Sequence, residues 1–267
     1  MRNRLSAWLA LAFLPALCAS AQSQGYREIP VRNGGAVSGL VRWAGPQPSL
    51  PPFPVHQDAG VCDLDKSGAR PSPRLRIGPG GGVADAVVYL SNISRGKPLP
   101  PRGLRDARAW VIRECEYRPH VLIVPVHSYL AMRNDDPLLH NLRMFGAAGY
   151  NLPMPERGTL FVKRLPKAGV ISVRCDAGHG WMSGSIHVTE HPYYAATDRE
   201  GRFSLTDVPP GKYLLKAWHE GWRVRRVIPK DGRPAFYEFE RPVELSREVT
   251  VREGGAEVVE FTLSEDR

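Results

Sequence analysis

Three residues with soft or borderline donor atoms, Cys175, His179 and Met182, share one eight-residue stretch, and a further imidazole, His140, lies upstream. Two imidazoles and a thiolate with a weak thioether form a ligand set that suits copper in electron-transfer sites. The same cysteine and histidines with a fourth ligand would suit zinc, and a buried free cysteine beside unrelated side chains is the non-functional alternative. We therefore predict one copper ion, with His140, Cys175, His179 and Met182 as its ligands.

The segments around these residues indicate how they meet. Cys175 directly follows a strand-like run, and glycines in the loop after it let the chain turn back sharply. His140 follows Asp135-Asp136-Pro137, a turn signature, so we expect it near a strand end. Asn141 is expected to hydrogen-bond the cysteine loop and hold the two ligand segments together. Trp181 is expected to shield the metal from water.

Strand-like runs separated by turn signals dominate the rest of the chain, and no segment has a sustained helical period. This pattern predicts an all-β sandwich or barrel. A second unit is expected to begin near His191, and its last strand alternates apolar and polar residues as a half-buried strand does. The runs assigned to the first unit cover residues 36–43, 84–90, 109–113, 120–126, 129–133, 159–163, 170–174 and 185–189.

Residues 1–21 predict a signal peptide for export. Two arginines precede an apolar core over residues 7–17, and Ala19-Ser20-Ala21 forms a small-residue cleavage site. The apolar stretch is too short to span a bilayer comfortably, and no later segment approaches that length. We therefore expect a periplasmic protein with no transmembrane segment after signal cleavage. A retained N-terminal anchor is one alternative, and Cys18 leaves a lipoprotein as another.

The cysteine count indicates one disulfide. Export places the chain in an oxidising compartment, where cysteines pair. Cleavage after Ala21 leaves Cys62, Cys115 and Cys175, and an odd number indicates one pair plus a thiol with another role. Because Cys175 lies among the candidate ligands, Cys62 and Cys115 are the expected pair.

The chain is basic, with a formal net charge of +9 and a pI of about 9.6. Such a surface favours acidic partners or anionic membranes. No nucleic-acid motif or long basic run is present, so we expect an acidic redox partner protein and no nucleic acid. The chain contains no Gly-x-Ser-x-Gly elbow, no His-Glu-x-x-His and no phosphate loop. A copper site with all positions filled leaves no place for a substrate, so we expect that the protein is not an enzyme.

Four other histidines are expected to have structural or surface roles. His120 begins a strand and is expected to be a hydrogen-bonded structural residue. His187 alternates with apolar neighbours, which predicts that it faces the solvent. His191 and His219 are expected to make contacts between the two units or within turns.

Several motifs resemble those of a known family. The chain looks like the plastocyanin-like cupredoxins, and more closely like exported bacterial proteins that fuse such a domain to a carboxypeptidase-regulatory-like (transthyretin-like) β-sandwich. Most of residues 34–264 share the resemblance, and the cysteine loop is its most specific part. The matching segments are residues 85–90, 115–121, 134–141, 175–182, 191–198, 208–213 and 218–220.

The resemblance implies a cupredoxin-like Greek-key β-sandwich over residues 34–190, with a Pro/Gly-rich loop at 44–82. A smaller transthyretin-like β-sandwich would follow over residues 191–267. His140, Cys175 and His179 would be the equatorial copper ligands, and Met182 would be axial.

The spacing of the cysteine loop departs from that of plastocyanin, which has fewer residues between Cys and His and more between His and Met. Met144 or Met154 could therefore replace Met182, or the site could have three strong ligands only. The resemblance implies blue-copper (type 1) electron transfer, with a histidine edge near the surface as the electron port. Copper delivery or storage, and a metal-free module for adhesion or carbohydrate binding, are the alternatives.

Overall fold

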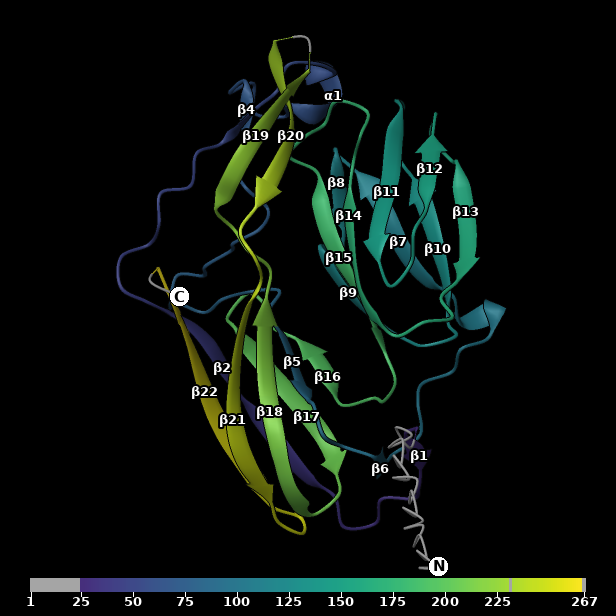
Figure 1. The fold of residues 1–267 in the computed structure, drawn as a ribbon, viewed down its shortest axis with the longest axis vertical. Helices are drawn as coiled ribbons and strands as arrows, with labels where there is room; N and C mark the ends of the chain where they lie inside the picture. Colours follow the sequence, from purple (N-terminus) through teal and green to yellow (C-terminus); the bar gives the residue numbers. More distant parts are fainter. Residues whose placement is uncertain (1–24, 231, 266–267) are drawn as a thin grey trace, which may run out of the picture.

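Strands make up most of the chain (Figure 1). The computed structural model describes residues 25–230 and 232–265, so the predicted signal peptide lies outside the described residues. Within these ranges, helix is limited to α1 (Ala59–Cys62) and a 3-10 turn, η1 (Leu104–Asp106). No helix in the described part of the chain is long and apolar enough to cross a membrane. The all-β prediction is confirmed.

The first β-sandwich consists of two sheets around one apolar core (Figure 1). Their strand orders are β13-β10-β7-β8 and β12-β11-β14-β15-β9. Neighbouring strands are antiparallel, except that β7 runs parallel to β10 and β9 parallel to β15. The bounds are β7 Arg108–Arg113, β8 Glu116–Arg118, β9 Val121–Pro125, β10 Tyr129–Asn134, β11 His140–Gly146, β12 Asn151–Met154, β13 Leu160–Arg164, β14 Gly169–Arg174 and β15 Ser183–Thr189.

Alternating side chains build the core of this sandwich. In β14, Ile171 and Val173 are buried while Ser172 between them is exposed, because successive side chains of a strand point to opposite faces. Ile171 packs in the same core as Trp110 and Leu130 of the facing sheet. Burying each large apolar side chain contributes roughly 1.5–3 kcal/mol. This packing fixes β11 and β14, the strands on whose ends two candidate ligands lie.

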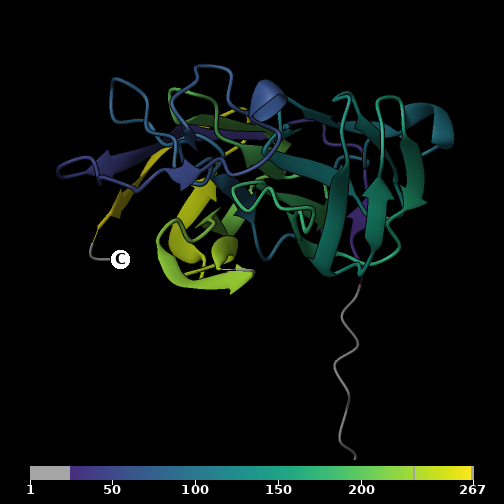
Figure 2. The ribbon, with the colours of Figure 1, turned by 90° about the horizontal axis from the view of Figure 1, so that it is seen from above.

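The second β-sandwich pairs the sheet β16-β5-β18-β21 with the sheet β17-β2-β22. It lies beside the first sandwich, and both views separate the teal strands of the first unit from the yellow strands of the second (Figures 1 and 2). The bounds are β2 Gly35–Ala44, β5 Val87–Leu90, β16 Tyr194–Ala196, β17 Arg202–Val208, β18 Gly211–His219, β21 Val243–Val251 and β22 Ala256–Ser264.

The predicted domain division requires a correction at the N-terminal end of the first unit, because β2 and β5 belong to the second sandwich. The prediction placed residues 34–190 in the first unit and 191–267 in the second. Instead, β2 runs parallel to β22, and Val37 shares one apolar core with Phe261. β5 likewise pairs with β18. The first sandwich therefore begins at β7, and segments from both ends of the chain build the second.

The Pro/Gly-rich stretch between β2 and β5 is fastened to the first sandwich. It carries the short antiparallel strands β3 (Phe53–Pro54) and β4 (Ala69–Arg70), with α1 between them. A disulfide joins Cys62, the last residue of α1, to Cys115 between β7 and β8, while Cys175 is a buried free thiol. The predicted cysteine pair is confirmed. Two further short strands, β1 (Arg27–Glu28) and β6 (Arg95–Gly96), pair in parallel.

A hairpin from the second unit reaches the first sandwich. It consists of β19 (Val224–Lys230) and β20 (Arg233–Phe239), and it rises beside α1 and β4 in Figure 1. The ring of Tyr237 meets that of Phe53 edge-on, with 4.5 Å between their centroids. The hairpin thereby contacts the stretch that carries α1.

A buried ion-pair cluster joins the two units. Glu220 contacts the ring of His120, which confirms the prediction that His120 is a hydrogen-bonded structural residue. Arg74 contacts the other oxygen of Glu220 at 2.7 Å and donates to the Gly221 carbonyl at 2.6 Å. Burial alone would raise the pKa of Glu220, but the charges of His120 and Arg74 lower it to about 2.

The prediction that His187 faces the solvent is wrong. Its neighbours Ile186 and Val188 do point into the core, as the alternation indicated, but His187 is only 4% exposed. The ring of Trp218, from the second unit, covers it with 4.5 Å between centroids. Alternation predicts the face of a strand but does not show whether another unit covers that face. His219, by contrast, does make a turn contact, through Nδ1 to the Glu220 carbonyl at 2.8 Å.

Candidate metal centre

Two neighbouring strands bring the candidate ligands to one end of the first sandwich. His140 is the first residue of β11, and Cys175 directly follows β14. β11 and β14 are antiparallel, with Arg143 opposite Arg174, so the start of one lies beside the end of the other. The loop from Cys175 then returns to β15 and carries His179. Segments distant in sequence therefore meet because of sheet pairing.

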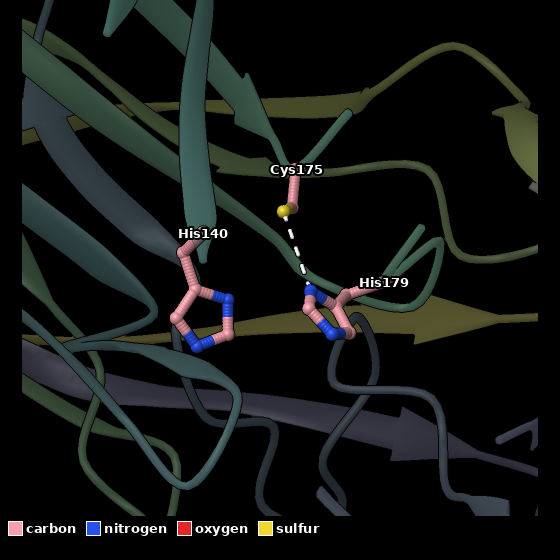
Figure 3. A group of neighbouring side chains, drawn as sticks. All are labelled: His140, Cys175 and His179. Carbon is pink, nitrogen blue, oxygen red and sulfur yellow. Dashed lines mark hydrogen bonds between the residues drawn. The ribbon is translucent and has the colours of Figure 1, made fainter. Parts of the chain in front are cut away.

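His140, Cys175 and His179 form a compact group (Figure 3). Their nearest donor atoms, one from each residue, all lie within 4.8 Å of one another. Sγ of Cys175 lies 3.6 Å from Nδ1 of His179, and the two imidazole centroids are 4.8 Å apart. Both histidines are 0% exposed, and the cysteine is 1% exposed. Three donor atoms thus converge in a buried site.

Carboxylates bind the outer nitrogens of both imidazoles. Nε2 of His140 lies 2.9 Å from Oδ2 of Asp136, and Nε2 of His179 lies 3.0 Å from Oδ2 of Asp58. Nδ1 of His140 is buried and has no hydrogen-bond partner. A buried polar atom without a partner is costly, and this atom belongs to the group of converging donors. An imidazole tied to a carboxylate on one side and free on the other is the arrangement that metal-ligating histidines use.

The loop between β7 and β8 holds Asp136 in place. The two carboxylate oxygens of Asp136 accept hydrogen bonds from the backbone N–H groups of Glu114 at 2.8 Å and Cys115 at 2.9 Å. Burial opposes ionisation of Asp136, but the hydrogen bond from His140 and these N–H groups lower its pKa overall. The carboxylate is therefore charged and fixed when it contacts the imidazole. Sequence reasoning used Asp136 only as part of a turn signature.

No sequence signal pointed to Asp58. It lies 121 positions before His179, in the Pro/Gly-rich stretch that the disulfide fastens to the first sandwich. Burial and the neighbouring His140 ring lower the pKa of His179, although Asp58 opposes this shift. The lowered pKa favours the neutral imidazole of His179, which is the form that binds a metal.

The environment of Cys175 favours a thiol unless a cation is nearby. Burial raises its pKa to about 11, although backbone N–H groups of Ala177, Asn141 and His179 partly stabilise the thiolate. A coordinated metal ion deprotonates a thiol outright, so metal binding would supply the missing charge. The predicted role of Asn141 is confirmed, because its Oδ1 accepts a hydrogen bond of 3.4 Å from the Asp176 N–H in the cysteine loop.

The cysteine loop is closed by backbone contacts of Met182. Its N–H donates to the His179 carbonyl at 2.9 Å, and its carbonyl accepts from the Cys175 N–H at 3.4 Å. Met182 is buried in the same apolar core as Met144 and Met154. Met154 also lies opposite His140 across β11 and β12. The assignment of Met182 as the axial ligand stays a prediction.

Trp181 and the stretch that carries Asp58 enclose the three candidate ligands. The indole of Trp181 is buried, donates to the Cys115 carbonyl at 3.1 Å and meets the His179 ring edge-on at 5.4 Å. Both imidazoles are 0% exposed, so neither ring is open to the solvent. Nε2 of His179 lies 3.0 Å from Asp58, whose side chain is 40% exposed, and the histidine edge expected near the surface stays a prediction.

The donor set narrows the choice of metal. Two imidazoles and one thiolate, buried among methionines, suit copper, whereas zinc would need a fourth strong ligand. A second nearby group, of Cys115, Asp136 and His140, cannot use its sulfur because Cys115 is disulfide-bonded. The residues present therefore fit copper.

Comparison with known structures finds similar copper proteins. A purple cupredoxin from Nitrosopumilus maritimus is 23% identical over 31% of this chain and 99% of its own, with a TM-score of 0.28. A reduced Cu(I) amicyanin mutant is 23% identical over 32% of this chain and 83% of its own, with a TM-score of 0.28. The Cu-containing nitrite reductase of Thermus scotoductus is 21% identical over 36% of this chain but only 24% of its own, with a TM-score of 0.30. No family model and no curated protein sequence matches this chain.

Proposed function

We propose that this protein is a type 1 copper protein that acts in electron transfer. Nδ1 of His140, Nδ1 of His179 and Sγ of Cys175 would hold one copper ion, and Met182 would be its fourth, weaker ligand. The bound ion supplies a one-electron couple between Cu(II) and Cu(I). We further propose export to the periplasm, a redox partner protein with an acidic surface, no enzymatic activity, and a transthyretin-like second sandwich.

The observation that carries this proposal is the buried triangle of two nitrogens and one sulfur, with each outer imidazole nitrogen bound to a carboxylate. Asp136 and Asp58 keep each Nδ1 directed inward and prevent the rings from turning. The sheet holds Cys175 at the end of β14. A site whose ligands cannot move changes little between oxidation states, and this favours rapid electron transfer.

Other residues keep the site dry and ready to bind metal. Trp181 covers one side of the His179 ring and excludes water. Backbone N–H groups around Cys175 stabilise the thiolate once its proton has left. The basic net charge of the chain favours approach of an acidic partner. Burial of all three donors counts against copper delivery, because a carrier must present its metal to the acceptor.

Adding Cu(II) to the purified protein tests this proposal. We expect one copper per chain and an intense visible band from thiolate-to-copper charge transfer, and we expect Cys175→Ser to abolish the band. Ser94→Ala, at an exposed serine between β5 and β6, is the control and should leave the band intact. A colourless protein that binds no copper would contradict the proposal and favour a metal-free module. A colourless Cu(I)-only site with exchangeable metal would favour delivery.

A further inference from the structure

We propose that residues 57–62 and the β19–β20 hairpin form a two-part cover over the metal loop, and that Asp58 is the positioning residue that latches it to His179. Copper then enters or leaves the site only when this cover opens. The inference rests on the proposed function and goes beyond it, since it assigns the control of metal exchange to residues outside the ligand set.

The first part of the cover lies directly on the metal loop. Nε2 of Gln57 donates a hydrogen bond of 2.6 Å to the Ala177 carbonyl, and Asp58 binds Nε2 of His179 at 3.0 Å. Gln57 also packs so closely on Gly178 that a Cβ at that position would collide with its side-chain amide. Two successive residues thus hold three successive residues of the loop, and they cover the edge of His179.

The geometry of Asp58 suits this contact rather than a role in its own helix. It precedes α1, the position where an aspartate usually accepts a hydrogen bond from the helix backbone. Here its side chain makes no such bond, and its backbone is left-handed, with φ of 54° and ψ of 30°. Asp and Asn tolerate this conformation better than most residues. The carboxylate is thereby free to bind His179.

The disulfide anchors this part to the frame of the site. Cys62 ends α1 four residues after Asp58, and its partner Cys115 donates to Asp136, the carboxylate that holds His140. The Cys115 carbonyl also accepts the hydrogen bond from Trp181. The disulfide therefore links the first part of the cover to the backbone that contacts Asp136 and Trp181, on the opposite side of the site.

The hairpin supplies the second part. A Cβ at Gly180 would lie 2.8 Å from the Ala235 carbonyl and 2.9 Å from the Tyr237 ring, so the hairpin rests directly on the metal loop. Tyr237 also contacts Phe53 in β3, the strand that precedes the first part of the cover. Arg174, the residue before Cys175, lies over the ring of Phe236 at 4.8 Å. The hairpin inserted between β18 and β21 of the second sandwich is thus part of the enclosure of the site.

Metal release from the full-length protein tests the role of Asp58. The protein is loaded with Cu(I), and transfer to the chelator bathocuproine disulfonate is followed by absorbance. Asp58→Gly keeps the left-handed backbone but removes the carboxylate, and we expect about tenfold faster release, the lower end of what such partners contribute. Asp58→Asn keeps an oxygen acceptor for Nε2 of His179 but loses the charge, so its release rate should lie between those of Asp58→Gly and the wild type. Asp65→Asn changes an exposed carboxylate of the same stretch and should match the wild type.

A second readout needs no metal. In the copper-free protein we expect iodoacetamide to alkylate Cys175 faster in Asp58→Gly than in the wild type, with Asp58→Asn between the two. The Tyr237→Ala variant should also accelerate both alkylation and copper release. If Asp58→Gly released copper and was alkylated at the wild-type rates, the proposed role of the cover would be wrong. Failure of the wild type to bind copper would instead overturn the proposed function, and the alkylation rates would still report on the cover.

Discussion

The backbone N–H of Cys115 donates a hydrogen bond of 2.9 Å to the carboxylate oxygen Oδ2 of Asp136. The same oxygen lies 2.9 Å from Nε2 of His140. The other half of the disulfide, Cys62, ends the short helix that follows Asp58. The carboxylates that orient the two candidate histidine ligands are therefore fixed on the two sides of one disulfide.

Asp136→Asn is expected to weaken copper binding by about 10- to 100-fold, the usual effect of removing the carboxylate behind a ligating histidine. The asparagine loses the charge and one of the two oxygens that bind the N–H groups of Glu114 and Cys115. Competition with a copper chelator measures the affinity. The control is Asp135→Asn, whose carboxylate pairs with surface arginines. Equal affinities for the two variants would show that Asp136 does not support the ligand.

Removing the disulfide should destabilise the fold. The bond closes a loop with a sequence separation of 53 residues, and its loss in the Cys62→Ala, Cys115→Ala double variant should cost about 4 kcal/mol of unfolding free energy. The shift of the urea midpoint at neutral pH measures this. An unchanged midpoint would mean that the link does not constrain the unfolded chain.

Glu220→Gln should destabilise the interface between the two units. The substitution leaves the buried guanidinium of Arg74 without a counter-charge, and breaking one side of a buried pair costs about 3–5 kcal/mol. Urea unfolding measures the loss. Glu240→Gln is the matched control, since this glutamate pairs with Arg223 at the surface, and its effect should stay within about 0.5 kcal/mol. Similar effects of the two substitutions would contradict the role of Glu220 as the buried counter-charge of Arg74.

Burial of His187 makes stability depend on pH. Burial lowers its pKa from the ordinary value of 6.5 to about 4, so between these values the unfolded chain binds a proton that the folded protein does not. The neutral, buried imidazole therefore contributes to the free energy of unfolding fully above pH 6.5. This contribution, about 3 kcal/mol, is lost as the pH falls to 4. Unfolding midpoints over this range should fall less steeply for His187→Gln than for the wild type. His56→Gln, at an exposed histidine, should keep the wild-type slope, and a shared slope in all three proteins would refute the prediction.

The candidate site was largely predictable because its signals are local. The cysteine loop holds two donors within five residues, Cys175 and His179, and the turn before His140 indicated a strand end. Counting cysteines was enough to pair Cys62 with Cys115. Asn141 followed from its position next to a candidate ligand. Each of these inferences needs only a few neighbouring residues or a simple count.

The remaining features depend on contacts between segments far apart in the chain. The apolar alternation of β2 predicts a strand but cannot show that its partner is β22, at the other end of the chain. The same limit hid the contact between Asp58 and His179, and the burial of His187 under Trp218. Strand pairing and covering units determine these features, and neither leaves a local pattern in the sequence.

X-ray absorption at the copper edge of the loaded protein identifies the atoms that bind the ion. We expect two imidazole nitrogens and one short sulfur shell, with loss of that sulfur shell in Cys175→Ser and of one nitrogen in His140→Ala. A wild-type spectrum with nitrogen and oxygen neighbours alone, or a short sulfur shell that persists in Cys175→Ser, would contradict this set of ligands.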